Sequence, residues 1–183
     1  GGTNVIDYWT MTTAGNAKDF GDMTVAAASG GGVNSPTRGI IGGGDSPAYT
    51  NVIQYLTIQT RGNMADFGDL TLARGYVVGA DSATRGLFMS GYDNSAGSNT
   101  TIIDYIQIAT LGNAIDFGDT VVASRHAGGT SDRIRGVSTS GSPGFAGSLD
   151  YVQIATTGNA TDFGDMFQTR RGLAGCSNAH GGL

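Results

Sequence analysis

The chain contains four near-identical copies of one stretch, each with an identical Tyr and each ending in Asp-Phe-Gly-Asp. The copies are IDYWTMTTAGNAKDFGD from Ile6, IQYLTIQTRGNMADFGD from Ile53, IDYIQIATLGNAIDFGD from Ile103 and LDYVQIATTGNATDFGD from Leu149. From one copy to the next, the landmarks are 47, 50 and 46 residues apart. A period of this size is typical of supersecondary units that bury their hydrophobic faces against one another. The sequence therefore predicts a repeat protein.

The composition agrees with short strands joined by tight turns. The chain has 32 Gly, its 15 acidic residues are all Asp, and Lys18 is its single Lys. Asp and Gly favour turns, whereas the good helix formers Glu and Lys are nearly absent. The glycines follow no Gly-X-Y period, which excludes a collagen helix. We therefore expect an all-β fold.

The unit that ends at Asp119 indicates how the strands are arranged. Two short apolar segments, 73–83 and 84–93, precede 100–110, where residues on the two faces alternate as in a strand. We expect 111–119 to form a turn, because it is rich in Gly, Asn and Asp, and 120–125 to form a fourth strand. Three to four short antiparallel strands in about 47 residues are typical of a β-propeller blade.

The predicted fold is thus a β-propeller, or a propeller segment, of about four repeats of 46–50 residues in one domain, residues 1–183. The repeat units cover approximately 1–26, 27–73, 74–124 and 125–169, and 170–183 begins a further unit or supplies the strand that closes the ring. Either the chain is a segment of a longer array or a four-bladed ring closes with an incomplete blade. The usual number of blades favours the segment.

The order of landmarks in each unit resembles the kelch repeat. The kelch Gly doublet matches Gly1-Gly2 and Gly42-Gly43, and it is degenerate as Ser90-Gly91 and Ser140-Gly141. The Tyr strand matches Tyr8, Tyr55, Tyr105 and Tyr151. The opening Arg matches Arg74, Arg125 and Arg170, with Ala27 in the first copy. The chain departs from the pattern where kelch units have Trp, since it has Phe20, Phe67, Phe117 and Phe163. The resemblance implies a kelch-like propeller.

The amino-acid sequence of the repeat also shows a resemblance that is more specific than the kelch spacing. Strings such as TTGNATDFGD, followed by RRGLAGCSNAHGGL, are similar to repeats in virion structural proteins of marine tailed phages, especially cyanophages. This resemblance covers all four copies. It implies a tail, fibre or capsid-associated protein that is located in the virion.

Charge and hydropathy limit the possible partners. The net charge is −5 without clustered Lys and Arg, so non-specific nucleic-acid binding is not expected. No apolar run is long enough for a transmembrane helix, and no signal-peptide pattern is present. Cys176 is the single Cys, which excludes a disulfide within the chain. The expected partners are other virion subunits or a host surface glycan or protein, and association with further copies of the chain stays open.

Several catalytic motifs are excluded. Asp-Phe-Gly in protein kinases requires a Gly-rich loop, a strand Lys and a catalytic loop, which this chain lacks. Cys176 and His180, with His126 as the only other His, cannot complete a zinc shell. The chain lacks the His, Tyr and Cys cluster of copper-dependent kelch enzymes, and it has no dedicated carboxylate pair for glycoside hydrolysis. We therefore expect no enzymatic activity and no cofactor.

The GNAxDFGD segments offer a weak alternative, a calcium site. Carboxylates at short spacing are hard ligands that suit calcium. The candidates are Asp19, Asp22, Asp66, Asp69, Asp116, Asp119, Asp162 and Asp165. We favour a structural explanation, in which Asn and Asp side chains bond to the backbone of a turn that Phe anchors in the core.

Three arginines precede Gly at the start of equivalent strands, Arg38, Arg85 and Arg135. On a propeller, equivalent positions converge around the axis, so these arginines are candidates to bind an anion or acidic sugar at the channel mouth. The alternative is that each pairs with an aspartate. Repetition favours this alternative, because a scaffold keeps its symmetry while a binding site normally breaks it.

The segments that differ between copies are better candidates for binding, since loops on rigid scaffolds carry function. They are 30–37, 45–50, 93–100, 127–132 and 142–148. Their aromatic residues Tyr49, Tyr92 and Phe145 are predicted to be exposed and to contact a ligand. We therefore expect a non-enzymatic virion structural or adhesion protein that displays variable loops. The alternative is a lectin-like or protein-binding propeller of non-viral origin, and an enzyme on this scaffold is a more distant third hypothesis.

Overall fold

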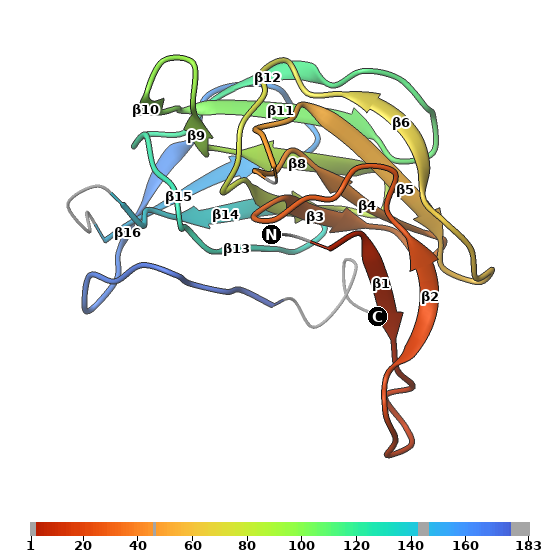
Figure 1. Ribbon diagram of the computed structural model, residues 1–183. Helices are drawn as coiled ribbons and strands as arrows, with labels where there is room; N and C mark the ends of the chain where they lie inside the picture. Colours follow the sequence, from red (N-terminus) through yellow and green to blue (C-terminus); the bar gives the residue numbers. More distant parts are fainter. Residues whose placement is uncertain (1–2, 46, 143–146, 177–183) are drawn as a thin grey trace.

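The computed structural model describes residues 3–45, 47–142 and 147–176. The regular secondary structure in these ranges consists of antiparallel strands (Figure 1). They include no helix that is long and apolar enough to cross a membrane. The prediction of an all-β fold is confirmed.

The strands form a series of sheets that follow the predicted repeat units. Unit 1 contains β1 (Val5–Tyr8) and β2 (Lys18–Asp22). Unit 2 contains β3 (Gly31–Asn34), β4 (Arg38–Gly42), β5 (Val52–Thr57) and β6 (Ala65–Asp69). Unit 3 contains β7 (Val78–Asp81), β8 (Arg85–Met89), β11 (Ile102–Gln107) and β12 (Ile115–Asp119), with a side hairpin of β9 (Tyr92–Asp93) and β10 (Ser98–Asn99). Unit 4 contains β13 (Gly129–Ser131), β14 (Arg135–Thr139), β15 (Ser148–Gln153) and β16 (Thr161–Asp165).

The strand that carries the repeated Tyr forms as predicted. It is the third strand of each four-stranded sheet, and it pairs in one register, for example Leu87 with Tyr105 and Val137 with Tyr151. In every unit the Tyr ring meets the Phe of the Asp-Phe-Gly-Asp segment edge to face, with ring centroids 5.7 to 5.9 Å apart. This aromatic pair fixes the third strand against the fourth.

The Asp-Phe-Gly-Asp segment is itself the last strand of each sheet, so the prediction of a turn at 111–119 is wrong for its second half. The segment 120–125, predicted as the fourth strand, contributes only an isolated bridge from Arg125 to Ser142. Pairing of β11 with β12 skips Phe117, which makes a β-bulge, and Gly118 follows at a φ of 144°. Pairing with the Tyr strand therefore outweighs the low strand propensity of Asp and Gly.

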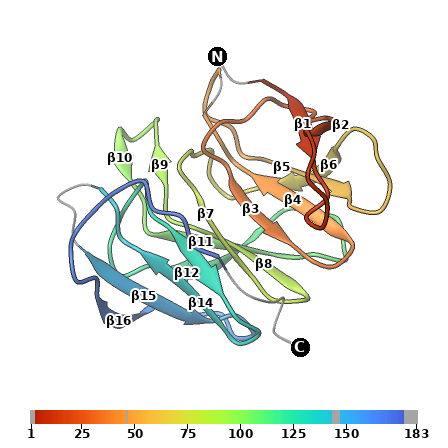
Figure 2. The ribbon, with the colours of Figure 1, turned by 90° about the horizontal axis from the view of Figure 1, so that it is seen from below.

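The first strands of units 2, 3 and 4 lie beside one another, so the units follow a curved row (Figure 2). A methyl group on Gly79 would lie 1.9 Å from the carbonyl oxygen of Gly32, and one on Gly175 would lie 2.0 Å from that of Gly129. Equivalent glycines thus allow the backbones of neighbouring units to touch. We call Gly32, Gly79, Gly129 and Gly175 the glycine row.

Neighbouring units are also joined at their outer edges. There, the Gly-Asn-Ala segment of one unit (Gly-Asn-Met in unit 2) contacts the last strand of the preceding unit, and we call this contact the latch. Between units 2 and 3, Gly112 N donates to Phe67 O at 2.9 Å and Ala114 N donates to Asp69 O at 2.8 Å. Asp69 N in turn donates to Asn113 Oδ1 at 3.1 Å. The same three bonds join units 1 and 2 and units 3 and 4. The expected side-chain-to-backbone bonds of Asn are confirmed, but they cross between units.

The hydrophobic core lies between units. One cluster joins Phe67 of unit 2 to Ile106 and Ile108 of unit 3, and a second joins Phe117 of unit 3 to Val152 of unit 4. Each fully buried side chain of this size contributes roughly 1.5–3 kcal/mol. The prediction that units bury their apolar faces against neighbours is confirmed.

A buried ion pair lies within unit 3. Arg74 and Asp104 are both fully buried, and Arg74 Nη1 donates to Asp104 Oδ2 at 2.9 Å. The remaining Arg74 nitrogens donate to the carbonyl oxygens of Ser90 and Phe88. Each guanidinium nitrogen therefore has a hydrogen-bond partner within the protein.

The other units hold different residues at the two positions of this pair. Gly44 N bonds to Arg74 O, and its counterpart Gly91 N bonds to Ser124 O, which places Ser124 at the position of Arg74. The match of Arg125 to the opening kelch Arg is therefore one residue out of register. In unit 2 the pair becomes Ala27 and Gln54.

Replacing one latch asparagine tests the joint. Asn113→Ala should lower the free energy of unfolding by about 1 kcal/mol, because Asp69 N loses its acceptor. Asn16→Ala is the matched control at concentrations where the chain is monomeric, since Asn16 holds the same position in unit 1, where no unit precedes it among the described residues. Urea denaturation of both variants measures the difference, and equal losses would contradict the role of the latch.

Candidate functional site

Only part of the predicted variable region consists of loops. The segments 45–50, 93–100 and 142–148 connect the second and third strands of units 2, 3 and 4. The segments 30–37 and 127–132 instead contain β3 and β13, so their prediction as loops is wrong. Their many small residues serve the close packing of the glycine row.

The connecting loops of the three units contact one another. The Tyr49 and Tyr92 rings lie 5.8 Å apart, and the Arg125 guanidinium lies 4.5 Å from the centroid of Tyr92. Asn99 Nδ2 donates to Ser142 O, which ties the side hairpin of unit 3 to unit 4. Side chains from different units thus form one surface at the same end of the sheets.

Two further residues extend this surface. The Tyr76 and His126 rings lie 4.3 Å apart, and both residues are left-handed, with φ of 57° and 55°. Ser29 holds the equivalent position of unit 2 with a φ of 57°. A positive φ is uncommon for residues other than Gly and costs about 1–3 kcal/mol, and such strain often accompanies functional sites. The three units place different side chains at this position, so the repeat symmetry is broken here.

Asp45 provides the negative charge of the group. Its interaction with the Tyr76 hydroxyl, followed by burial, raises the pKa of Tyr76. Burial, followed by the charge of Asp45, raises the pKa of Tyr49. Asp45 Oδ1 is buried and has no hydrogen-bond partner among the described residues. We call Asp45, Tyr49, Tyr76, Tyr92, Arg125 and His126 the loop cluster.

Two hollows border the loop cluster. One, of about 410 Å³, is lined by Tyr92, Asn99 and Arg125 together with smaller residues. The other, of about 430 Å³, is lined by Tyr76, His126 and Ser29 together with smaller residues. Rings, a cation and an amide are therefore accessible in concave surfaces, and this arrangement favours binding of a polar ligand.

The loop cluster predicts a pH-dependent stability. Burial, with the charges of Arg125 and Arg171, lowers the pKa of His126. The unfolded chain therefore binds this proton more readily, so the contribution is intact above about pH 6.5 and is lost as the pH falls through the folded pKa. The melting temperature of the protein should fall more between pH 8 and pH 5 than that of His126→Asn, because Asn tolerates the left-handed backbone without titrating. Equal falls would contradict this assignment.

The three repeated arginines lie away from the loop cluster and contact the scaffold. Arg38 and Arg85 lie over the rings of Tyr55 and Tyr105, at 4.9 and 4.7 Å from the centroids. Both also donate to backbone carbonyl oxygens of the next unit, Arg38 Nη1 to Ile108 at 2.7 Å and Arg85 Nη1 to Ile154 at 3.0 Å.

Arg135 lies 5.3 Å from the centroid of Tyr151. The three arginines therefore pair with tyrosine rings of their own units, and none of them makes an ion pair with Asp among the described residues. These contacts favour the structural role, although the partner is a ring and a carbonyl instead of the expected aspartate.

The calcium alternative gains no support from the arrangement of the aspartates. No three His, Cys or Asp side chains group together in the part of the chain that the structure describes. Asp162 Oδ1 accepts from Gly164 N within its own segment, and Asp119 Oδ1 accepts from Thr101 Oγ1. Backbone and hydroxyl donors are the partners that the structural explanation requires.

Removal of divalent cations provides the corresponding prediction. An excess of chelator should leave the thermal midpoint of unfolding unchanged, because hydroxyl and backbone donors engage the carboxylates of Asp119 and Asp162. Differential scanning calorimetry with and without chelator measures this midpoint. A large fall would restore calcium as an integral part of the fold.

The sequence identified some residues of the loop cluster and missed others. Tyr49 and Tyr92 are brought together, but both are half-buried, so the prediction that they are exposed is wrong. Phe145 lies outside the described residues. The sequence alone did not single out Asp45, Tyr76, Arg125 or His126 as site residues. One signal could have identified Tyr76 and His126: when the repeat units are aligned, the two residues share a position whose side chain differs from unit to unit, although the flanking residues are similar.

Comparison with known proteins does not assign a function. Neither the models of known protein families nor the sequences of curated proteins give a match to this chain.

Proposed function

We propose that the chain is a non-enzymatic structural or adhesion protein of a virion, in which kelch-like propeller units hold a binding surface for a host glycan or another virion subunit. The observation that carries the proposal is the loop cluster, where Asp45, Arg125 and the aromatic rings gather from units 2, 3 and 4. The repeated residues, in contrast, are engaged between units. Recognition and architecture thus use separate sets of residues.

The proposal of a propeller is supported by the order of the strands. Each four-stranded sheet is an antiparallel meander, and the first strands of consecutive units are neighbours. Blades of a propeller have this arrangement around their axis. The latch and the glycine row repeat the same contacts from unit to unit.

The chemistry of the loop cluster fits a carbohydrate. Tyrosine rings offer flat apolar faces with a polar edge, and they suit the C–H faces and hydroxyls of a sugar. The Asn99 amide lines the hollow beside Tyr92 and offers a hydrogen bond to a ligand hydroxyl. Arg125 adds a donor for an acidic group. An acidic or hydroxyl-rich glycan is therefore the expected ligand.

Screening on a glycan array tests this ligand class. The protein should bind a defined set of glycans, and Tyr92→Ala should weaken binding by roughly tenfold, about 1.4 kcal/mol, through loss of the stacked ring. Tyr92→Phe is the matched control, because it keeps the ring. Absence of binding to any glycan would favour a purely structural subunit.

The location in a virion requires its own experiment. Mass spectrometry of purified virus particles should detect the chain as a stoichiometric component. A chain that binds glycans but occurs only as a free cellular protein would instead support the lectin-like propeller of non-viral origin.

A further inference from the structure

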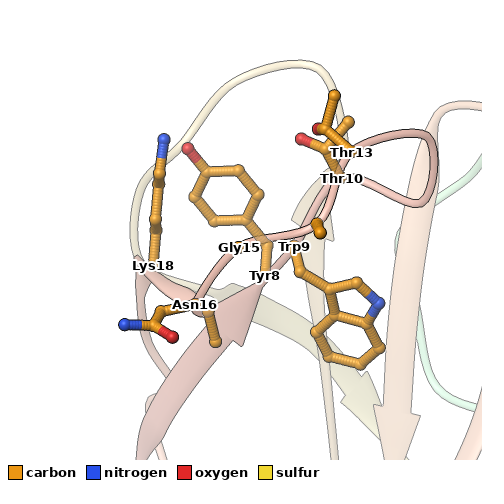
Figure 3. A pocket seen from close by; sticks show the side chains of 9 residues that line it. Tyr8, Trp9, Thr10, Thr13, Gly15, Asn16 and Lys18 are labelled. Carbon is orange, nitrogen blue, oxygen red and sulfur yellow. The ribbon is translucent and has the colours of Figure 1, made fainter.

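Unit 1 carries one unpaired half of the latch. Gly15, Asn16 and Ala17 hold the positions of Gly112, Asn113 and Ala114, but they are exposed and make no latch bonds among the described residues. They line a hollow of about 230 Å³ together with Tyr8, Trp9 and Lys18 (Figure 3). The backbone donors and the Asn16 amide are thus free to bind.

Unit 4 carries the complementary half. Phe163 and Asp165, at the end of β16, hold the positions of Phe67 and Asp69, which accept the latch between units 2 and 3. A methyl group on Gly164 would meet no atom within 4 Å, whereas one on Gly68 would lie 2.4 Å from Gly112 O. The outer edge of unit 4 is therefore uncovered.

The apolar residues of both faces are uncovered in the same way. Phe163 is 52% exposed, while Phe67 and Phe117 are each 3% exposed. On unit 1, Met11 is 87% exposed, while Ile108, its counterpart in unit 3, is 2% exposed. Side chains that form the core between internal units thus lie open on the two outermost faces, as is typical of an interaction surface.

The two faces also carry opposite charges at matching positions. Arg170, which directly follows unit 4, holds the position of Arg74, and Asp7 of unit 1 holds the position of Asp104. Inside the chain these positions form the fully buried ion pair at 2.9 Å. Each outer face therefore presents one half of that pair.

The inner edge of unit 4 is prepared for a further unit as well. Residues 173–176 lie alongside β13, with Thr130 Oγ1 donating to Cys176 O at 2.9 Å. Gly175 continues the glycine row against Gly129. Residues 173–176 thus occupy the position that the first strand of the next unit would take. The third and fourth strands of that unit would be equivalent to β1 and β2.

We propose that a second copy of this chain docks its unit 1 on unit 4 of the first, head to tail, and completes the latch, the core contact and an Arg170–Asp7 ion pair between chains. β1 and β2 of one copy then join residues 173–176 of the other in a composite unit. Units 1 and 4 lie at opposite ends of the molecule in both views, so one chain does not bring these two faces together (Figures 1 and 2). Such a heterologous contact forms a closed ring or an extended array.

Charge exchange between chains tests the proposal. Sedimentation equilibrium of the 183-residue chain should give a mass of at least two copies, rising with concentration. Asp7→Arg and Arg170→Asp should each weaken association by roughly 30-fold or more, because each places like charges in the contact. An equimolar mixture of the two variants should associate again, since each contact then joins Arg to Asp. Asp116→Arg, at an exposed internal position, controls for the change in net charge and should associate like the parent chain.

Each result decides the question. Loss of association in both single variants with recovery in the mixture supports the head-to-tail contact. A chain that stays monomeric at all concentrations overturns the proposal. Association that survives either substitution, or that is not recovered in the mixture, places the contact elsewhere and also overturns it.

Discussion

Replacing Asp104 by Asn should lower the free energy of unfolding by about 3–5 kcal/mol, the largest loss expected for any single polar residue of this chain. The amide keeps the shape of the carboxylate but leaves the charge of Arg74 buried without a counter-ion. Burial already lowers the pKa of Arg74, which reflects the cost of holding this charge away from water. Urea denaturation followed by tryptophan fluorescence or circular dichroism measures the loss.

The chain itself offers the control and the rescue. Asp150→Asn makes the same change one unit later, where Ser124 takes the place of Arg74, and should cost much less. The double variant Arg74→Ala/Asp104→Gln copies the Ala27 and Gln54 pair and should recover most of the stability. Equal losses in Asp104→Asn and Asp150→Asn would contradict the importance of the ion pair.

Adding a single methyl group to the glycine row should be nearly as damaging. Gly79→Ala would place a carbon 1.9 Å from the carbonyl oxygen of Gly32, so β7 must move away from β3. The neighbouring atom is backbone and cannot rotate aside, which puts the expected loss at about 3 kcal/mol or more, the upper end of overpacking effects. Thermal denaturation should show a midpoint lower by roughly 6 °C or more.

Gly32→Ala is the matched control. A methyl group at this position meets no atom within 4 Å, although Gly32 is the other partner of the same contact. The variant should unfold within about 0.5 kcal/mol of the parent chain. Similar losses for Gly32→Ala and Gly79→Ala would show that glycine acts here through backbone conformation instead of close approach.

The sequence predicted the features that depend on periodicity. Alternation in the Tyr strand and the spacing of the four copies were sufficient to identify the strands and the burial of apolar faces between units. Both are properties of local pattern and repetition. No long-range contact has to be known to infer them.

The same reasoning failed where a contact between segments decides the structure. Asp-Phe-Gly-Asp has the composition of a turn, but Phe117 packs on Tyr105 and Gly118 pairs with Ile103, and these contacts make the segment a strand. The Gly-rich segment 30–37 has the composition of a loop, but its glycines allow β3 to approach β7. Composition alone shows that a segment is rich in small residues, but it does not show whether they form a loop or allow two strands to approach closely.

Only those residues of the candidate site that lie in visibly divergent segments could be predicted from the sequence. Tyr49 and Tyr92 lie in loops that visibly differ between copies. Tyr76 and His126 lie in segments that resemble their counterparts, and only their shared left-handed backbone and ring contact single them out. A three-dimensional alignment of the units was needed to show that these positions are equivalent.

Because each unit carries both halves of the latch, its gene segment is a self-sufficient building block. Recombination between near-identical stretches would insert or delete about 47 residues at a time, and each added block would bring its own donors, acceptors and apolar face to the two new junctions. The length of the array can therefore change without any compensating substitution elsewhere, while the loops that a new block displays remain free to diversify.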